Sequence, residues 1–192
     1  MREKMKILHI DSSILGEASI SRQLTAAIAA HLKAKHTDAE IEYLDLAQQD
    51  IPHLTTDILM GQNTEQAALG SRLIEQYLAA DIVIVGAAMY NFSLASSLKA
   101  WIDRISVAGK TFKYTEQGPV GLAGDKTVYI ASSRGGVYGD DSVLDFQEKF
   151  LKTVFGFTGV QDIQVIRAEG VSMGEDAKQV ALKAAFEKIE AL

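Results

Sequence analysis

The segment Ile82–Gly86 places the strongest constraint on the fold, because every residue before its glycine is apolar. A strand with one face in water alternates apolar and polar residues. A strand that is apolar on both faces is typical of the centre of a parallel sheet, where helices cover each side. Four further apolar-rich runs have the length of strands: Met5–Ile10, Ile41–Leu46, Thr127–Ala131 and Ile163–Arg167.

Segments with the helical period follow each predicted strand. The clearest has apolar residues at spacings of three and four, and Ser93 is placed to cap its N-terminus. Its apolar face consists of Leu94, Leu98, Trp101, Ile102 and Ile105. The other predicted helices cover residues 20–32, 65–78, 143–154 and 175–189. Five strands that alternate with five helices predict a parallel sheet built from right-handed βαβ units.

The order of the strands follows from their polarity. The runs Ile41–Leu46 and Ile163–Arg167 carry charge and alternate, as edge strands do. An order of 2-1-3-4-5, with helices on both faces, places these two strands at the edges and predicts a flavodoxin-like, doubly wound α/β fold. At 192 residues without a linker, the chain is expected to form one domain over residues 1–192. Ligands of such folds bind at the carboxyl ends of the first and third strands.

Composition excludes several classes of function. The net charge of −6 with scattered lysines and arginines argues against a nucleic-acid partner. The absence of cysteine excludes disulfides and thiolate metal sites, and the histidines lack metal-ligand spacing, so no metal is expected. No run approaches the 18 apolar residues of a membrane span, and Lys4 and Lys6 interrupt the N-terminus, unlike a signal peptide. We therefore expect a cytoplasmic protein without a membrane partner.

The loop after the first strand, Ser12–Arg22, is rich in serine and leads into a helix. Hydroxyls and free N–H groups at a helix N-terminus favour an anion. The dinucleotide pattern G-x-G-x-x-G is absent, and a serine-rich loop fits a flavin phosphate instead. Arg22 is unfavourable in the first helical turn unless an anion binds there. The alternative is that Ser19 or Ser21 merely caps the helix.

The loops after the third and fourth predicted strands also suit a ligand. The segment Ala88–Ser93 carries two aromatics and an amide, which could form a slot for a flat heteroaromatic ring or could pack on neighbouring helices. The segment Ser132–Gly139 contains paired glycines, which allow a backbone to approach a ligand but also form plain turns. Three such loops at the place that the fold predicts indicate a flavin site.

Four stretches of the chain resemble the FMN-dependent NADH azoreductases, which also act as NADH:quinone oxidoreductases. They are Ser-Ser-Ile-Leu with the following Ser-Ile-Ser, Met-Tyr-Asn-Phe, Lys-Thr-Phe-Lys-Tyr-Thr-Glu-Gln-Gly-Pro, and Ser-Arg-Gly-Gly. The likeness runs in matching order over nearly the whole chain, and the second and fourth stretches at this separation are highly specific. One departure is Ala88, where the family has proline, so a looser loop and weaker FMN retention are expected.

The resemblance implies which residues bind the cofactor. The FMN phosphate would be held by Ser13, Ser19, Ile20 and Ser21. The isoalloxazine ring would be held by Met89, Tyr90, Asn91, Phe92, Ser133, Arg134, Gly135 and Gly136. NADH would reduce FMN, and FMN would then reduce a quinone or an aromatic azo compound in the same slot, by a ping-pong mechanism. Because the flavin carries out the chemistry, no catalytic side chain is assigned.

The segment Gly109–Gly124 has no clear period and exceeds the usual length of a connection in such folds. It carries Phe112 and Tyr114, whose exposure is costly unless something covers them. In the resembled family this segment reaches the flavin pocket of a neighbouring subunit. The resemblance therefore implies a homodimer in which Phe92 and Tyr114 line the substrate pocket. The alternative is that both aromatics fold back on their own core.

Two other functions compete with this interpretation. A flavodoxin-type electron carrier would bind FMN without turning over substrates. A serine hydrolase could use Ser172, because Gly170–Gly174 matches the G-x-S-x-G pattern. That hydrolase fold orders its residues serine, acid, histidine, whereas every histidine here precedes Ser172, the last being His53.

Overall fold

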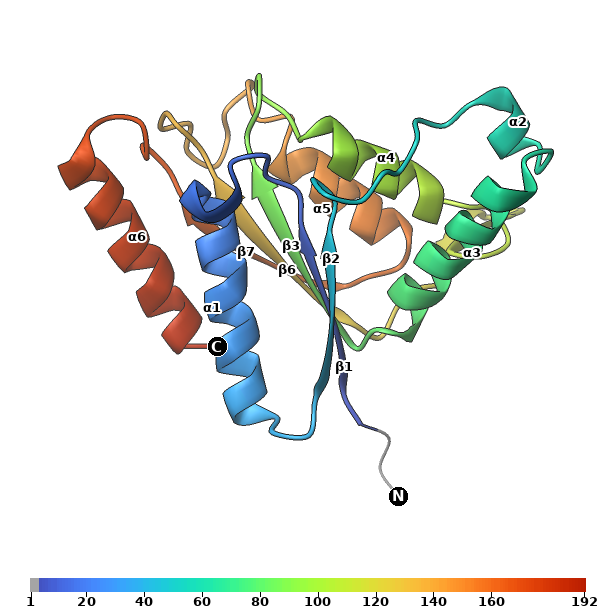
Figure 1. Cartoon of the computed structure of the whole chain (residues 1–192), viewed down its shortest axis with the longest axis horizontal. Helices are drawn as coiled ribbons and strands as arrows, with labels where there is room; N and C mark the ends of the chain where they lie inside the picture. The colour runs from blue at the N-terminus through green and yellow to red at the C-terminus, as the bar shows by residue number, and fades with distance from the viewer. Residues whose placement is uncertain (1–3) are drawn as a thin grey trace.

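The computed structural model describes residues 4–192 and contains a five-stranded parallel sheet between two layers of helices (Figure 1). The strands of this sheet are β1 (Lys6–Asp11), β2 (Glu40–Asp45), β3 (Ile82–Ala88), β6 (Thr127–Ser133) and β7 (Asp162–Ala168). The helices are α1 (Ile20–Lys35), α2 (Thr56–Leu59), α3 (Thr64–Ala79), α4 (Ser96–Ile105), α5 (Glu148–Phe157) and α6 (Glu175–Glu190). A 3-10 turn, Gly16–Ala18, precedes α1. Within this described part, no helix has the length and apolar character that a membrane crossing needs.

The strand order is β2-β1-β3-β6-β7, which is the predicted 2-1-3-4-5 order when the five parallel strands are counted alone. The two charged strands, β2 and β7, lie at the edges as expected. All neighbouring strands in this sheet are parallel, so their carboxyl ends share one edge. In Figure 1 this is the upper edge, where the loops after β1, β3 and β6 gather.

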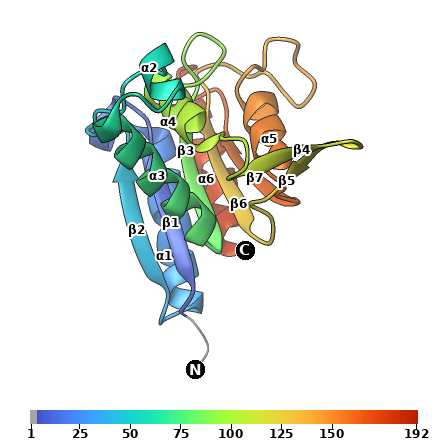
Figure 2. The ribbon, with the colours of Figure 1, turned by 90° about the vertical axis from the view of Figure 1, so that its right-hand side faces the viewer.

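Strand β3 shows why the sheet needs two helical layers. Its residues are buried along almost the whole strand, and they alternate between two cores. Val83 and Val85 pack in the core beneath α3, α4 and α5, whereas Ile82 and Ile84 pack in the core beneath α1 and α6. Figures 1 and 2 show these helices on opposite faces of the sheet. The apolar run predicted this double burial correctly.

Aromatic packing holds the layer formed by α3, α4 and α5. Tyr77 of α3 lies edge-on to Trp101 of α4, with ring centroids 5.9 Å apart, and 6.2 Å from the ring of Phe155 in α5. The hydroxyl of Tyr77 is hydrogen-bonded to that of Thr158 at 2.7 Å, which satisfies the polar end of the ring. All four residues are buried.

Helix α4 begins at Ser96. The sequence predicts that Ser93 caps this helix, and this prediction is wrong. The reason is a tight turn over residues 90–93, in which Tyr90 and Ser93 exchange backbone hydrogen bonds at 3.0 Å in each direction. Ser93 is committed to that turn, and Ala95 takes the cap position without a side-chain hydrogen bond.

Helix α5 begins at Glu148, five residues later than the predicted start at Val143. The carboxylate of Asp145 accepts hydrogen bonds from the N–H groups of Gln147 and Glu148, at 3.0 and 2.9 Å. Such side-chain acceptors satisfy the free N–H groups of a helix start and therefore fix where it begins. Val143 and Leu144 lie before it in an exposed loop.

The segment Gly109–Gly124 is not an irregular loop as predicted, because it contains an antiparallel hairpin of β4 (Phe112–Thr115) and β5 (Gly118–Gly121). The hairpin extends to one side of the molecule in Figure 2. The two aromatics that the sequence grouped together have opposite environments. Phe112 is buried against Phe157, with ring centroids 4.5 Å apart, whereas Tyr114 is 73% exposed.

The base of this hairpin yields a first prediction. A Cβ at Gly121 would lie 2.1 Å from the backbone nitrogen of Gly159, so only glycine allows this close approach. Gly121→Ala should therefore push the hairpin away from the end of α5 and lower the free energy of unfolding by about 1–3 kcal/mol. Urea denaturation measures this, and Val120→Ala, at an exposed neighbour, is the matched control. Equal stability of the two variants would contradict the predicted packing constraint.

Candidate active site

The loops after β1, β3 and β6 surround a cavity of about 270 Å³ at the carboxyl edge of the sheet. The start of α1 and the segment before α6 complete its walls. The lining residues are Ser13, Leu15, Ala18, Ser19, Ile20, Ala88, Met89, Tyr90, Ser133, Arg134, Gly135, Val171, Ser172 and Lys178. Most of the predicted cofactor residues are therefore brought together. Ser21, Asn91, Phe92 and Gly136 lie next to this set in the chain, outside the lining itself.

The start of α1 offers hydrogen-bond donors to the cavity. Ser19 is the N-cap, and its hydroxyl accepts a hydrogen bond from the N–H of Arg22 at 3.3 Å. The hydroxyl of buried Ser21 is 3.1 Å from that of Ser19. Helix geometry leaves the N–H groups of Ile20 and Ser21 without an intrahelical acceptor. Donors at the positive end of a helix dipole form a suitable site for an anion.

Arg22 stands in the first turn of α1 because carboxylates of the protein itself, and not a bound ligand, balance its charge. Its guanidinium binds both oxygens of Asp45, at 2.6 and 2.8 Å, and also lies 3.8 Å from Asp11. It donates two further hydrogen bonds to the carbonyl oxygen of Ser13, at 2.8 and 3.1 Å. Arg22 therefore joins the edge strand β2 to the serine loop and fixes the backbone of that loop.

Asp11 ends β1 beneath the loop and is almost fully buried. The absence of a side chain at Gly86 makes room for it, because a Cβ there would lie 2.6 Å from the carboxylate. Burial alone would raise the pKa of Asp11, but contacts with His9, Thr25 and Tyr43 outweigh burial and hold the pKa below its usual value. The carboxylate therefore stays charged opposite Arg22.

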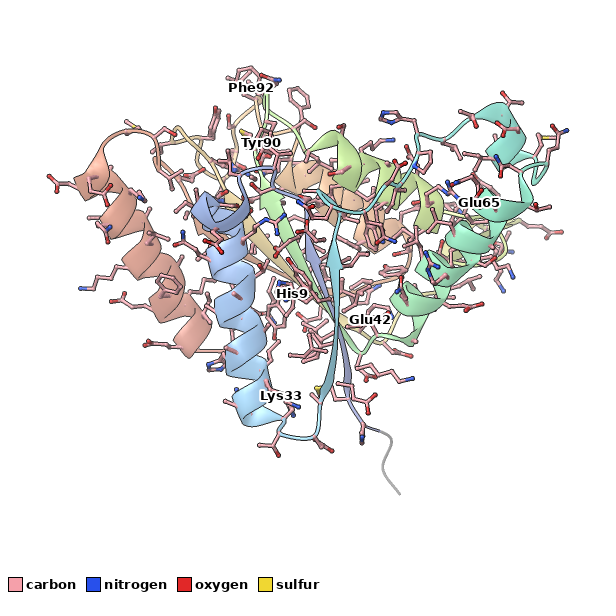
Figure 3. All side chains as sticks on the ribbon, viewed as in Figure 1. His9, Lys33, Glu42, Glu65, Tyr90 and Phe92 are labelled. Atoms are coloured by element: carbon pink, nitrogen blue, oxygen red, sulfur yellow. The ribbon has the colours of Figure 1, made fainter. Side chains whose placement is uncertain are left out.

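Tyr90 connects the loop after β3 to the loop after β1. Its hydroxyl is 3.0 Å from the hydroxyl of Ser13 and accepts a hydrogen bond from the N–H of Ile14 at 3.3 Å. In Figure 3 the side chains of Tyr90 and Phe92 lie at the upper edge of the sheet, above the ends of the strands. The aromatic ring of Tyr90 thus forms part of the cavity wall while its hydroxyl stays satisfied.

Asn91 and Phe92 form the tip of this loop in an unusual conformation. Both have positive φ, 48° and 69°, as the central residues of a type I′ turn require. Left-handed conformations cost free energy for residues other than glycine, and they cluster at binding sites. The turn leaves Phe92 45% exposed, edge-on to Tyr138 with centroids 6.3 Å apart. The loop therefore presents an aromatic face next to the cavity.

Arg134 lies in the loop after β6, but its guanidinium is buried in an ion cluster. It contacts the carboxylates of Asp145, Glu148 and Glu169 at 2.9, 2.8 and 3.1 Å. Its Nε also donates to Gln147. With its charge balanced by three acids, the side chain of Arg134 holds the loops in place, and direct contact with a ligand is left to its neighbours.

The paired glycines run beside the segment that precedes α6. The N–H groups of Gly170, Val171 and Ser172 donate to the carbonyl oxygens of Gly136, Arg134 and Gly135, at 3.0 to 3.2 Å. These bonds hold Ser172 against Gly135, where a Cβ would lie 3.0 Å from the Ser172 hydroxyl. Within the described residues, none of the histidines lines this cavity, so the geometry lacks the base that a serine hydrolase needs.

Sequence reasoning did not assign Lys178, which lines the cavity from the first turn of α6. In the sequence, the helical pattern of residues 175–189 identifies Lys178 only as a surface residue of a helix. The signal appears only in the structure, where Lys178 of α6 and the start of α1 line the same cavity. Figure 1 shows α6 and α1 on the same face of the sheet. In residues 4–192, no group of three or more histidine, cysteine or acidic side chains is arranged to hold a metal ion.

Comparisons with known proteins agree with this geometry. A family model described as a flavodoxin-like fold matches residues 5–192. An FMN-dependent NADH:quinone oxidoreductase of Azospirillum brasilense is 54% identical over 98% of this chain and 97% of the relative. One of Rhizobium meliloti is also 54% identical, over 96% of this chain and 95% of the relative. The chain belongs to the family of the FMN-dependent NADH:quinone oxidoreductases, which has the flavodoxin-like fold.

Solved structures point in the same direction. An azoreductase from Bacillus anthracis, strain Sterne, has a TM-score of 0.87 at 28% identity, over 98% of this chain and all of that chain. An FMN-dependent NADH-azoreductase from the Ames Ancestor strain, solved in complex with FMN, has a TM-score of 0.87 at 25% identity. It covers 97% of this chain and 96% of that chain. These azoreductase structures therefore share the fold of this chain over nearly its whole length.

The Arg22–Asp45 pair yields a second prediction. The hydrogen bonds from Arg22 hold the pKa of Asp45 below its ordinary value of 3.8. A carboxyl with a lowered pKa stabilises the fold above its unfolded pKa, and the contribution is lost as pH falls through the folded value. Asp45→Asn should therefore lower the free energy of unfolding by about 1 kcal/mol at pH 7. This difference from the unsubstituted protein should shrink below about pH 4.

Urea denaturation of the flavin-free protein between about pH 3 and pH 7 measures this difference. Asp50→Asn, at an exposed position on the following loop, is the matched control and should change little at any pH. A difference for Asp45→Asn that stays constant across the range would contradict the role of the ion pair.

Proposed function

We propose that this protein is an FMN-dependent NADH:quinone oxidoreductase that also cleaves aromatic azo bonds. The observation that carries the proposal is the meeting of the three loops around one cavity at the switch point of the sheet, between β1 and β3. The names of the relatives at 54% identity and of the azoreductase structures support the reaction and the cofactor. A cytoplasmic location, where NADH is available, is part of the same proposal.

The residues present fit the phosphate of FMN. In the proposed site the hydroxyls of Ser13, Ser19 and Ser21 and the N–H groups of Ile20 and Ser21 bind it. The three serines are at most 1% exposed, and the hydroxyl of Ser13 is hydrogen-bonded to that of Tyr90. The donors are therefore positioned before a ligand arrives. No carboxylate lines the cavity among the described residues, and a phosphate there would meet no direct repulsion.

The residues also fit a flat ring system. Met89–Phe92 and Ser133–Gly136 would hold the isoalloxazine ring between the two loops. Gly135 lines the cavity, and a Cβ there would lie 3.0 Å from the Ser172 hydroxyl. Arg134 contributes by fixing its loop through the buried acids, and not by touching the ring. The exposed face of Phe92 is available to an acceptor that stacks over the ring. The expected loosening of this loop by Ala88 stays a prediction.

Bound FMN would supply the redox chemistry: a hydride from NADH would reduce it, and two electrons with protons from water would then pass to a quinone. Cleavage of an azo bond to two amines would need four electrons, and therefore two such cycles with two NADH. The chain contributes binding, orientation and exclusion of water. The described lining contains neither a histidine nor a carboxylate, so we assign no acid or base catalyst. One slot beside the ring would hold NADH and the acceptor in turn, which requires a ping-pong order.

We also propose a homodimer. A groove of about 800 Å³ lies between α4 and α5, lined by apolar side chains such as Leu94, Phe146 and Phe150. Around it Val143 is 83% and Phe146 58% exposed, which is a costly surface for a monomer. A second copy would cover this groove, and Tyr114 on the projecting hairpin would reach the partner's substrate pocket beside Phe92.

The central test measures the flavin directly. Purified protein should bind FMN, NADH should bleach its absorption, and a quinone should sustain steady NADH oxidation. Gly135→Val should raise the Kd of FMN about tenfold or more, because the new side chain meets Ser172 and distorts the cavity wall that both residues form. Gly156→Ala, a helical glycine with open space around it, is the matched control and should leave FMN affinity unchanged.

Two results would overturn parts of the proposal. Failure of the protein to bind micromolar FMN would remove the cofactor assignment. FMN binding without steady NADH oxidation would favour the electron carrier.

The dimer is tested through its hairpin. Light scattering should give twice the mass of the 20.8 kDa chain. Tyr114→Ala should change the KM for a quinone by about tenfold, the order of one lost aromatic contact, while FMN stays bound. Lys113→Ala, at the exposed adjacent position of β4, is the control. A fully active monomer in solution would show that the hairpin serves another purpose.

A further inference from the structure

Lys178 contributes a cation to the cavity that neither the motifs nor the family resemblance assigns. It lies in the first turn of α6, where its N–H donates to the carbonyl oxygen of Gly174 at 3.1 Å. The serine loop and the start of α1 form another part of the same cavity wall through Ser13, Ser19 and Ile20. The side chain of Lys178 is 34% exposed, so it is partly covered where it lines the cavity.

The charges around the cavity single out this lysine. Among the described lining residues, the cationic side chains are Arg134 and Lys178, and none is acidic. Arg134 is neutralised by three carboxylates, as described above. Lys178 forms an ion pair with Glu175 at 3.5 Å, and the side chain of Glu175 is 68% exposed. Exposed ion pairs at this helical spacing contribute little, so Lys178 can turn to a stronger anion.

The fold fixes the approach of Lys178 to the serine loop. The three backbone hydrogen bonds from Gly170, Val171 and Ser172 tie the segment before α6 to the loop after β6. Gly174, with φ of 114°, then turns the chain into α6. Figure 1 shows α6 beside α1 on the same face of the sheet. A ligand on the N-terminus of α1 therefore lies between that helix end and the first turn of α6.

We propose that Lys178 supplies the counter-charge for the phosphate of FMN and thereby makes the protein select phosphorylated over unphosphorylated flavin. This inference rests on the proposed function. The helix end and the serine hydroxyls offer dipoles and neutral donors, which together amount to a fraction of a charge. The flavin phosphate is a dianion near neutral pH, and a lysine adds a full positive charge with three donors.

The test compares two flavins that differ only in the phosphate. Flavin-free protein is titrated with FMN and with riboflavin, and quenching of flavin fluorescence gives each Kd. Lys178→Gln should raise the Kd of FMN about tenfold, the cost of one charge-assisted hydrogen bond, and should change the Kd of riboflavin less than about twofold. Lys178→Arg should keep most of the FMN affinity, because it keeps the charge.

A lysine elsewhere on α6 provides the matched control. Lys183 is 79% exposed, outside the cavity lining, and 3.9 Å from Glu187. Lys183→Gln removes the same charge from the same helix and should leave both affinities unchanged. Added salt should weaken FMN binding by the unsubstituted protein more than by Lys178→Gln, since screening acts on the charge that the variant lacks. Far-UV circular dichroism establishes that each variant is folded.

The outcomes separate this inference from the proposed function. If the unsubstituted protein binds neither flavin, the proposed function fails. If it binds FMN, and Lys178→Gln keeps the same ratio of FMN to riboflavin affinity, the role of Lys178 is overturned while the proposed function stands. Equal losses for Lys178→Gln and Lys183→Gln would also overturn it, because they would reflect the net charge of the protein and not a local contact.

Discussion

Strand β3 is buried on both faces, so it can exist only between two layers of helices. The same helices allow the sheet to be parallel, because each parallel strand must return through a crossover that covers one face. Parallel strands end at the same edge, and the loops after β1, β3 and β6 are therefore neighbours although they lie far apart in the chain. The position of the cavity follows from the burial of one apolar strand.

Two arginines, the partly buried Arg22 and the buried Arg134, then fix the loops that the sheet has gathered. Arg22 joins Asp11 and Asp45 to the backbone of Ser13, and Arg134 joins the loop after β6 to acids before and within α5. Buried ion pairs add little net stability, but their many directed contacts favour a single arrangement of loops. Rigid loops lose less entropy when a ligand binds. We interpret both arginines as positioning residues that prepare the site.

The sequence predicts those parts of the structure that local patterns determine. The strand order, the edges and the gathering of the loops all follow from periodicity and polarity, as in Ile82–Gly86. The errors fall where a particular side-chain cap, a distant contact or an unusual backbone conformation decides. The start of α5 depends on Asp145, and the hairpin of residues 112–121 depends on Phe112 packing against Phe157. The turn over residues 90–93 uses positive φ at Asn91, which asparagine tolerates, and at Phe92, where the residue type does not indicate it. Lys178 joins the site only because α6 lies beside α1.

A chain with a net charge of −6 must bind an anionic cofactor without repelling it. The structure reduces this conflict by holding several acids near the site in contact with arginines. Asp11 and Asp45 face Arg22, and the three acids around Arg134 share that guanidinium. Each arginine thus screens the carboxylates that hold it, and the described cavity lining is left without an acidic side chain. Among the described lining, the end of α1 and Lys178 are then the positive groups that several carboxylates do not already surround, and a bound anion meets these groups directly.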